Sequence, residues 1–284
     1  SLTEDDTIWL GASDRIRDTI RRVTGDKIRP EAFYWAVDER TPEATDFADE
    51  AMILGALPED RAAALGITQP THVAIWDAAR AIAEKRWNQP LIHDPNGLMR
   101  AAETAADARI GDSTIRARML HLLEHALIPA AVARRIIDVT QKAGITVSAN
   151  GAGWNREPDV RRAAPIWRSE TSPRAVIFGG RRDAFTRDVL ETVARGVPLL
   201  MHDPGGSTAP AHTIKEVIST GEMTTFSGGP TLAAAIHTIR QDFRAAQRKA
   251  APARRRVLSA HTWAARWRAL TESPSIMTMP ADAG

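Results

Sequence analysis

The chain has 284 residues, 43% hydrophobic and 25% charged, with a formal net charge of +2. This is typical of a globular protein with a sizeable core and does not favour nucleic-acid binding. No cysteine is present, which excludes disulfides, thiolate metal sites and cysteine nucleophiles. We expect no membrane span, because no apolar run approaches roughly 20 residues, and a cytoplasmic, reducing setting, because the first residues do not resemble a signal peptide.

The first half of the chain, residues 1–143, is rich in Ala, Arg, Glu and Leu and is predicted to be mostly helical. Only Thr7–Leu10 suggests a strand there. Apolar residues follow helical spacing in four segments: Ala78–Trp87, Gly97–Ala108, Thr114–Leu127 and Ala130–Ala143. We expect Pro129 to interrupt the helix between the last two segments and Gly144 to cap the final one. This half is thus predicted to be a helical insertion or cap.

From residue 144 onward, short apolar runs alternate with amphipathic segments. The predicted strands are Ile145–Ser148, Ala175–Phe178, Val197–Met201 and Met223–Phe226. The predicted helices are Ala184–Ala194 and Pro230–Arg248. Strands that alternate with helices indicate βαβ units and a parallel sheet. We therefore predict an α/β fold in which residues 144–284 form a Rossmann-like domain that ends in a helix.

The segment from Gly179 to Glu191 joins a predicted strand to a predicted helix. In open α/β sheets ligands bind beyond the carboxyl ends of the strands, and a helix N-terminus there suits a phosphate. Its arginines can add charge-assisted hydrogen bonds to a diphosphate; they are Arg181, Arg182 and Arg187. Asp183 and Glu191 can accept hydrogen bonds from sugar hydroxyls. The alternative is a solvated charged turn followed by an ordinary amphipathic helix.

The same segment carries a family resemblance. Asp183 and Glu191 keep the spacing of the Glu-x7-Glu motif of retaining GT-B glycosyltransferases, with Asp in the first position. The run from 181 to 200 is similar to the spore-maturation-type branch of group 1 glycosyltransferases. Three further landmarks of that branch occur in the same order: Gly151–Trp154, Gly221–Phe226 and a closing helix over Val257–Arg266. The resemblance extends from about residue 144 to residue 270.

This resemblance implies a GT-B donor-binding domain and metal-independent, retaining transfer of a sugar, with no cofactor beyond the UDP-, GDP- or similar sugar donor. By position, Asp183 would contact the transferred sugar and Glu191 the ribose hydroxyls, while Arg187 would face the diphosphate; these three are the catalytic candidates. The implied donor-binding residues are Gly151, Gly153, Trp154, Gly179, Gly180, Arg181, Arg182, Phe185 and Thr186. The acceptor, a glycan, a protein or a polyanion, is not specified.

A GT-B enzyme has two Rossmann-like domains, and residues 1–143 do not have the repeated strands of the acceptor domain. We expect the acceptor side to be absent, replaced or supplied by a partner chain. An alternative function is therefore a non-catalytic module that binds nucleotide sugars or another protein.

A third hypothesis comes from His121-Leu122-Leu123-Glu124-His125, which matches the His-x-x-Glu-His pattern of inverted zinc peptidases. On a helix the two histidines share one face and can bind zinc, with Glu124 as the base. The third ligand would be Glu170, Glu191 or Glu216. The alternative is two histidines at the edge of a packed helix.

Two compositional features remain. The basic run Arg240–Arg256 is interpreted as a solvated helical face, because it has few interleaved aromatic residues for base stacking beyond Phe243; phosphate binding is the alternative. Four tryptophans fall in the second half, and one of them can stack on a sugar or a base while most belong to the core: Trp154, Trp167, Trp263 and Trp267.

Overall fold

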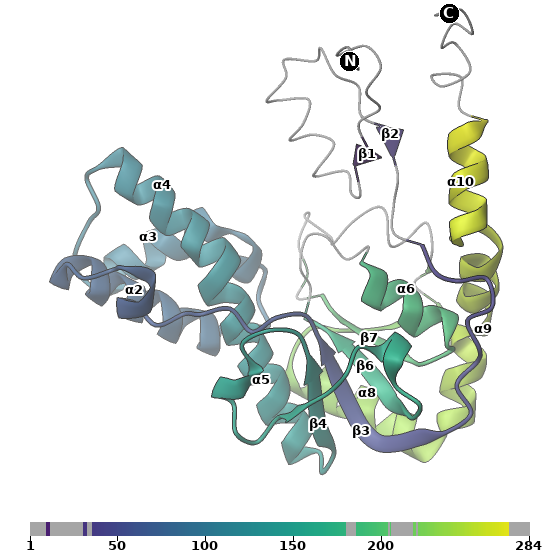
Figure 1. The fold of residues 1–284 in the computed structure, drawn as a ribbon. Helices are drawn as coiled ribbons and strands as arrows, with labels where there is room; N and C mark the ends of the chain where they lie inside the picture. Colours follow the sequence, from purple (N-terminus) through teal and green to yellow (C-terminus); the bar gives the residue numbers. More distant parts are fainter. Residues whose placement is uncertain are drawn as a thin grey trace, which may run out of the picture.

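The structure is a computed structural model, and it describes residues 10–11, 31–32, 36–179, 186–203, 205, 218–219 and 221–272. Figure 1 shows a parallel sheet covered by helices on both faces, with a lobe of helices projecting to one side. The predicted α/β fold class is confirmed.

Six strands form the sheet, all parallel, in the order β5-β4-β3-β6-β7-β8. They are β3 (Phe47–Leu54), β4 (Thr146–Asn150), β5 (Arg161–Arg162), β6 (Ser172–Phe178), β7 (Leu199–His202) and β8 (Thr224–Phe226). The chain enters at the central strand β3, adds β4 and β5 on one side, and then crosses to β6, β7 and β8 on the other. Rossmann-like sheets leave a ligand crevice at such a reversal, here between β3 and β6. A separate parallel pair joins β1 (Leu10–Gly11) to β2 (Glu31–Ala32).

β3 is the main element that the sequence prediction missed. The only strand predicted in the first half was Thr7–Leu10, of which Leu10 alone is described and lies in β1. In β3, Asp49 and Glu50 interrupt the apolar run that would otherwise have marked the strand. Glu50 is buried and accepts a hydrogen bond from an arginine of β5. The sheet is therefore not confined to residues 144–284, since its central strand comes from the N-terminal half.

The helices are α2 (Pro70–Lys85), α3 (Pro95–Ala105), α4 (Ser113–Leu122), α5 (Ile128–Lys142), α6 (Arg187–Ala194), α8 (Gly229–Gln241), α9 (Phe243–Ala260) and α10 (Trp263–Thr271). A π-helical turn, Leu123–Leu127, joins α4 to α5. Short 3₁₀ turns occupy Ala63–Leu65, Pro90–His93, Trp154–Arg156 and Ile166–Arg168.

Helix α2 begins eight residues before the predicted segment Ala78–Trp87, and the division of the chain into helices differs from the prediction at three further places. Pro129 does not interrupt the helix: it lies in the first turn of α5, directly after the π turn. A proline costs a helix one hydrogen bond, and here that loss coincides with a turn where the bonding register already changes. Gly144 does cap α5 as predicted, with φ +73° and its N–H bonded to the carbonyl of Gln141 at 2.9 Å.

The other two differences lie near the C-terminus. The single helix predicted over Pro230–Arg248 is two helices, because Asp242 leaves helical geometry and caps α9 through the N–H of Ala245 at 2.8 Å. The closing helix is likewise divided at Thr262, which pairs with Val37 and caps α10. Local side-chain caps thus override the continuous helical spacing.

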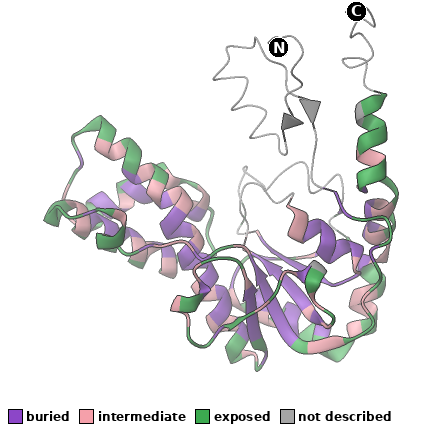
Figure 2. Cartoon of the chain, viewed as in Figure 1, coloured by how far each residue is buried: buried purple, intermediate pink, exposed green. Residues whose placement is uncertain are grey.

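The sheet is the middle of three layers. Alternate side chains of β3 and β6 enter two cores: Ile53 and Ile177 face α5 and α8, whereas Met52 and Val176 face α6 and α9. The first core continues without a break from the sheet through α5 into the lobe formed by α2, α3 and α4 (Figure 2). The lobe and the sheet therefore share one hydrophobic interior.

Candidate functional site

The carboxyl ends of the strands define the edge at which a ligand site is expected. Because all six strands are parallel, these ends lie along one edge of the sheet. The strands on either side of the reversal, β3 and β6, are followed by Gly55 and Gly179, and β4 is followed by Gly151. The segments that leave these strands therefore border the crevice position.

Most predicted site residues fall between β6 and α6. Gly179 follows β6, whereas Gly180, Arg181, Arg182, Asp183 and Phe185 lie outside the described residues. Thr186 is the N-cap of α6: its Oγ1 accepts a hydrogen bond from the N–H of Val189 at 3.3 Å. α6 thus begins at the carboxyl edge of the sheet, with the positive end of its dipole there. This is the strand–loop–helix context that phosphate binding requires.

Glu191, one turn into α6, is 5% exposed. The Nε of Arg187 lies 3.8 Å from its Oε1. Burial raises the pKa of Glu191, with the positive charges of Arg187 and Arg195 acting against the shift and the carboxylates of Asp38 and Asp188 adding to it. A hydroxyl that donates a hydrogen bond to a carboxylate in such a poorly solvated position lowers the free energy of its charged form.

Asp188 is a second carboxyl group on α6, and it is half-buried; the sequence prediction did not single it out. Burial raises its pKa too, against the opposing charge of Arg187. Its Oδ1 is buried and has no hydrogen-bond partner in the described part of the chain. Its position in the first turn of α6 could have suggested a role in the site. Acidic residues are common in that turn, however, because they stabilise the helix dipole.

The Gly151–Trp154 loop packs against the segment that follows β3. A Cβ on Gly153 would lie 2.0 Å from the carbonyl oxygen of Leu57, and one on Gly151 would lie 2.6 Å from that of Gly55. Both glycines have positive φ. Trp154 is 1% exposed and donates a hydrogen bond from Nε1 to the Gly55 carbonyl at 2.8 Å. These residues therefore hold together the loops that follow β3 and β4. The Trp154 ring belongs to the core and not to a surface that could stack on a ligand.

An ion network around the buried Asp60, which the sequence analysis did not predict, holds the same region. Asp60 is 3% exposed and receives two hydrogen bonds from the guanidinium of Arg134, at 2.7 and 2.8 Å. Burial alone would raise the pKa of Asp60, but the bonds from Arg134 and the nearby charge of Arg80 leave it below its usual value. Arg134 also binds Glu157 at 3.0 Å. The network links the loop after β3, helix α5 and the segment after β4.

His202, the last residue of β7, was also missed. It is fully buried and stacks on Trp87 with ring centroids 5.1 Å apart. Burial lowers its pKa to about 4, and the charge of His93 acts in the same direction. Neither ring nitrogen meets hydrogen-bond geometry with a described group, although the backbones of Trp87 and Gly179 lie close enough to oppose the pKa shift. A neutral imidazole therefore sits behind the start of the predicted donor loop.

The His121–His125 pair lies at the junction of α4 and the π turn, with ring centroids 4.4 Å apart. Within the described ranges, no group of three His, Cys, Asp or Glu side chains could hold a metal ion. Of the three predicted third ligands, Glu216 lies outside the described residues. Glu170 and Glu191 do not complete a site with the two histidines. The geometry thus offers zinc two ligands where a site needs at least three.

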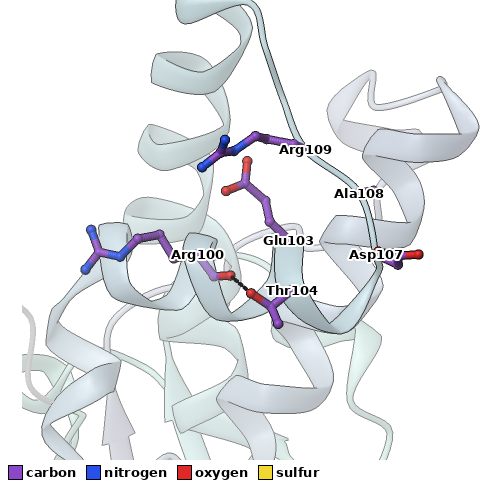
Figure 3. Close-up of a pocket in the computed structure, with 6 residues that line it drawn as sticks. All are labelled: Arg100, Glu103, Thr104, Asp107, Ala108 and Arg109. Carbon is purple, nitrogen blue, oxygen red and sulfur yellow. Dashed lines mark hydrogen bonds between the residues drawn. The ribbon is translucent and has the colours of Figure 1, made fainter.

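An open pocket of about 500 Å³ lies in the helical lobe, on α3 and the loop after it (Figure 3). Glu103 and Arg109 point toward one another there, and Arg100 lies on the other side of Glu103. Glu103 accepts hydrogen bonds from the N–H of Ile110 at 3.1 Å and from Arg116. These bonds fix the carboxylate as part of the lobe, and the pocket contains none of the predicted site residues.

Among the described residues, no helix is both long and apolar enough to cross a membrane. No family model matches the chain, and neither does any curated protein.

Proposed function

We propose that this chain is a glycosyltransferase that binds a nucleoside-diphosphate sugar at the carboxyl edge of its sheet, over β6 and α6, and transfers the sugar with retention and without a metal. The observation that carries the proposal is the buried carboxyl group of Glu191, on a helix that starts at the crevice of a Rossmann-like sheet. It supports the role that the family resemblance assigns to this residue.

The proposed reaction needs no covalent bond between the protein and the sugar. As the glycosidic bond to the donor breaks, negative charge builds on the departing diphosphate. The N-terminus of α6 and the guanidinium of Arg187 would stabilise that charge, and Glu191 would fix the nucleoside through its ribose hydroxyls. Fixed donors and charges placed where charge develops lower a barrier because they need no reorganisation.

One observation favours a second candidate, a module that binds nucleotide sugars without turnover. The described residues contain a single six-stranded sheet and the small β1–β2 pair, whereas a GT-B enzyme closes two Rossmann-like domains on its donor. Binding measured together with turnover separates the two candidates.

The test is thermal unfolding with a panel of nucleoside diphosphates and their sugars. A ligand at 100 times its dissociation constant adds about 2.7 kcal/mol of stability, or a rise in melting temperature of roughly 5–10 °C. We expect Glu191→Gln to abolish the rise. Glu103→Gln is the matched control, because Glu103 is equally buried, at 7% exposed, but lies in the lobe; it should leave the rise intact.

Turnover is then followed as donor hydrolysis and by the anomeric configuration of the product. Loss of one electrostatic contact at a transition state typically costs 10²- to 10³-fold, and we expect a loss of about that size in Arg187→Gln, which removes the charge that would face the departing diphosphate. A ligand-induced rise without hydrolysis would favour the binding module. No rise with any nucleotide would refute both candidates.

A further inference from the structure

The two C-terminal helices carry an unusual charge distribution. Residues 243–271, which span α9 and α10, contain eight Arg and Lys residues and no Asp or Glu. The whole chain has a formal charge of only +2, so the remainder is net negative at −6. Such an asymmetry directs a protein toward a polyanionic partner through one particular surface.

On α9 the positive charges form a stripe. Arg244, Arg248 and Arg255 are all exposed and, at 100° per residue, fall within about 40° of one another around the helix. The buried side of α9, formed by Ala250, Ala253 and Val257, lies opposite. The stripe therefore faces away from the sheet, and neither Arg244 nor Arg255 forms an ion pair with a described carboxylate.

On α10 the exposed feature is aromatic. Trp263 and Trp267, one helical turn apart, are 36% and 55% exposed and are the large hydrophobic residues that stand out on the described surface. Arg268 beside them is exposed as well. Figure 2 shows that α10 is mostly exposed and stands at the end of α9, beyond the layers of the sheet. Because the chain leaves helical geometry between α9 and α10, near Thr262, the two tryptophans lie on a separate helix beyond the end of α9.

We propose that α9 and α10 form a docking surface for an anionic lipid membrane, with the arginine stripe against the headgroups and the two indoles at the interface. An indole has an apolar body and a polar N–H, which suits the boundary between headgroups and acyl chains. Basic residues near a negatively charged surface each contribute to binding. Single-stranded nucleic acid is the weaker reading, because the arginine stripe has no aromatic side chains between its members on which bases could stack.

The test is co-sedimentation of the full chain with vesicles of phosphatidylglycerol and phosphatidylcholine, compared with vesicles of phosphatidylcholine alone. We expect binding only to the mixed vesicles. The triple change Arg244→Gln, Arg248→Gln and Arg255→Gln should reduce the partition coefficient by about a hundredfold, since each arginine contributes roughly fivefold. The control triple Arg86→Gln, Arg100→Gln and Arg109→Gln removes the same charge from exposed positions elsewhere and should change the partition coefficient by less than about fivefold.

Bromine-labelled lipids provide a second readout, because they quench only tryptophans that enter the interface. Wild-type fluorescence should fall on binding, and Trp263→Phe with Trp267→Phe should remove the quenching while the fold is retained. Absence of binding to anionic vesicles would overturn the proposal, as would equal losses in the two triple variants. Two further results would reassign the surface: an oligonucleotide bound through the same residues, or a dimer that Trp267→Ala converts to a monomer.

Discussion

The carboxyl groups on the two sides of the sheet reversal have pKa values that are shifted in opposite directions. After β3 and β4, the buried carboxylate of Asp60 is paired with Arg134 and its pKa is lowered. After β6, burial raises the pKa values of the half-buried Asp188 and the buried Glu191. Burial costs free energy in both places. The arginines beside Asp60 outweigh that cost, whereas Arg187 and Arg195 offset it at Glu191 only in part. The first side, here called the scaffold side, is thus stabilised by its own ion pairs, whereas the proposed function assigns the less favourable carboxyl groups of the second side to a ligand.

The largest expected effect tests the scaffold side. Gly153→Ala should destabilise the protein by about 4 kcal/mol, because the new methyl group would overlap the Leu57 carbonyl and the residue must keep φ +88°. Urea unfolding monitored by circular dichroism measures the change. Gly111→Ala is the control, since a Cβ there meets nothing within 4 Å. Similar stabilities for the two variants would mean that the loops after β3 and β4 are not fastened together.

Arg134→Met removes the partner of Asp60 and keeps much of the volume of the side chain. Asp60 keeps its ion pair with Arg80, at 3.5 Å, but loses both hydrogen bonds from Arg134. That loss at a buried carboxylate should cost about 3 kcal/mol at pH 7, discounted because Arg134 is 32% exposed. In the wild type, Asp60 has a lowered pKa, so its stabilising effect is present above pH 4 and is lost as the pH falls through its folded pKa. In the variant that dependence should be weaker, because Arg80 remains beside Asp60 but the hydrogen bonds from Arg134 are lost. Unfolding curves between about pH 2 and pH 5 measure the dependence, and an unchanged pH dependence in the variant would contradict the proposed pairing.

His202 gives a pH effect of intermediate size behind the donor loop. Its folded pKa of about 4 lies below the usual 6.5, so the unfolded chain binds more protons between these values. Stability should therefore fall by on the order of 2 kcal/mol as the pH drops from 6.5 toward 4. His202→Leu should flatten this dependence in part, because His261 has a similarly lowered pKa. An unaltered pH profile would show that His202 is hydrated or paired in solution.

The smallest effect has the opposite sign. Glu191→Gln should raise the stability of the ligand-free protein by about 1 kcal/mol at pH 7, as often happens when a functional group is held in an unfavourable environment. The raised folded pKa means that wild-type stability declines as the pH rises from the unfolded value through the folded value. Unfolding of both proteins at pH 5 and pH 8 measures the difference. A destabilised variant would place Glu191 with the scaffold, alongside Asp60.

The sequence predicted those parts of the molecule that depend on local pattern. The strands near 147, 176, 200 and 225 were found because each is a short apolar run bounded by turn residues, and Gly144 was found because helix caps are local. The ion pair of Asp60 with Arg134 spans 74 residues, and no spacing rule reaches that far. Gly151 and Gly153 were noticed as a motif, but the carbonyl groups that require them belong to a segment nearly 100 residues earlier. The catalytic roles of Asp183, Arg187 and Glu191 stay predictions.

The charges that hid β3 from the sequence prediction also bear on how the chain is made. β3 is the first strand of the six-stranded sheet to leave the ribosome, yet its earliest partner, β4, begins some 90 residues later. At usual rates of synthesis, the strand waits roughly 5–20 s without a neighbour. Asp49 and Glu50 interrupt its apolar run, as gatekeeper residues do in segments that are prone to aggregate. During that interval the intervening helices, whose contacts are local, can fold and provide the surface on which β3 is later covered.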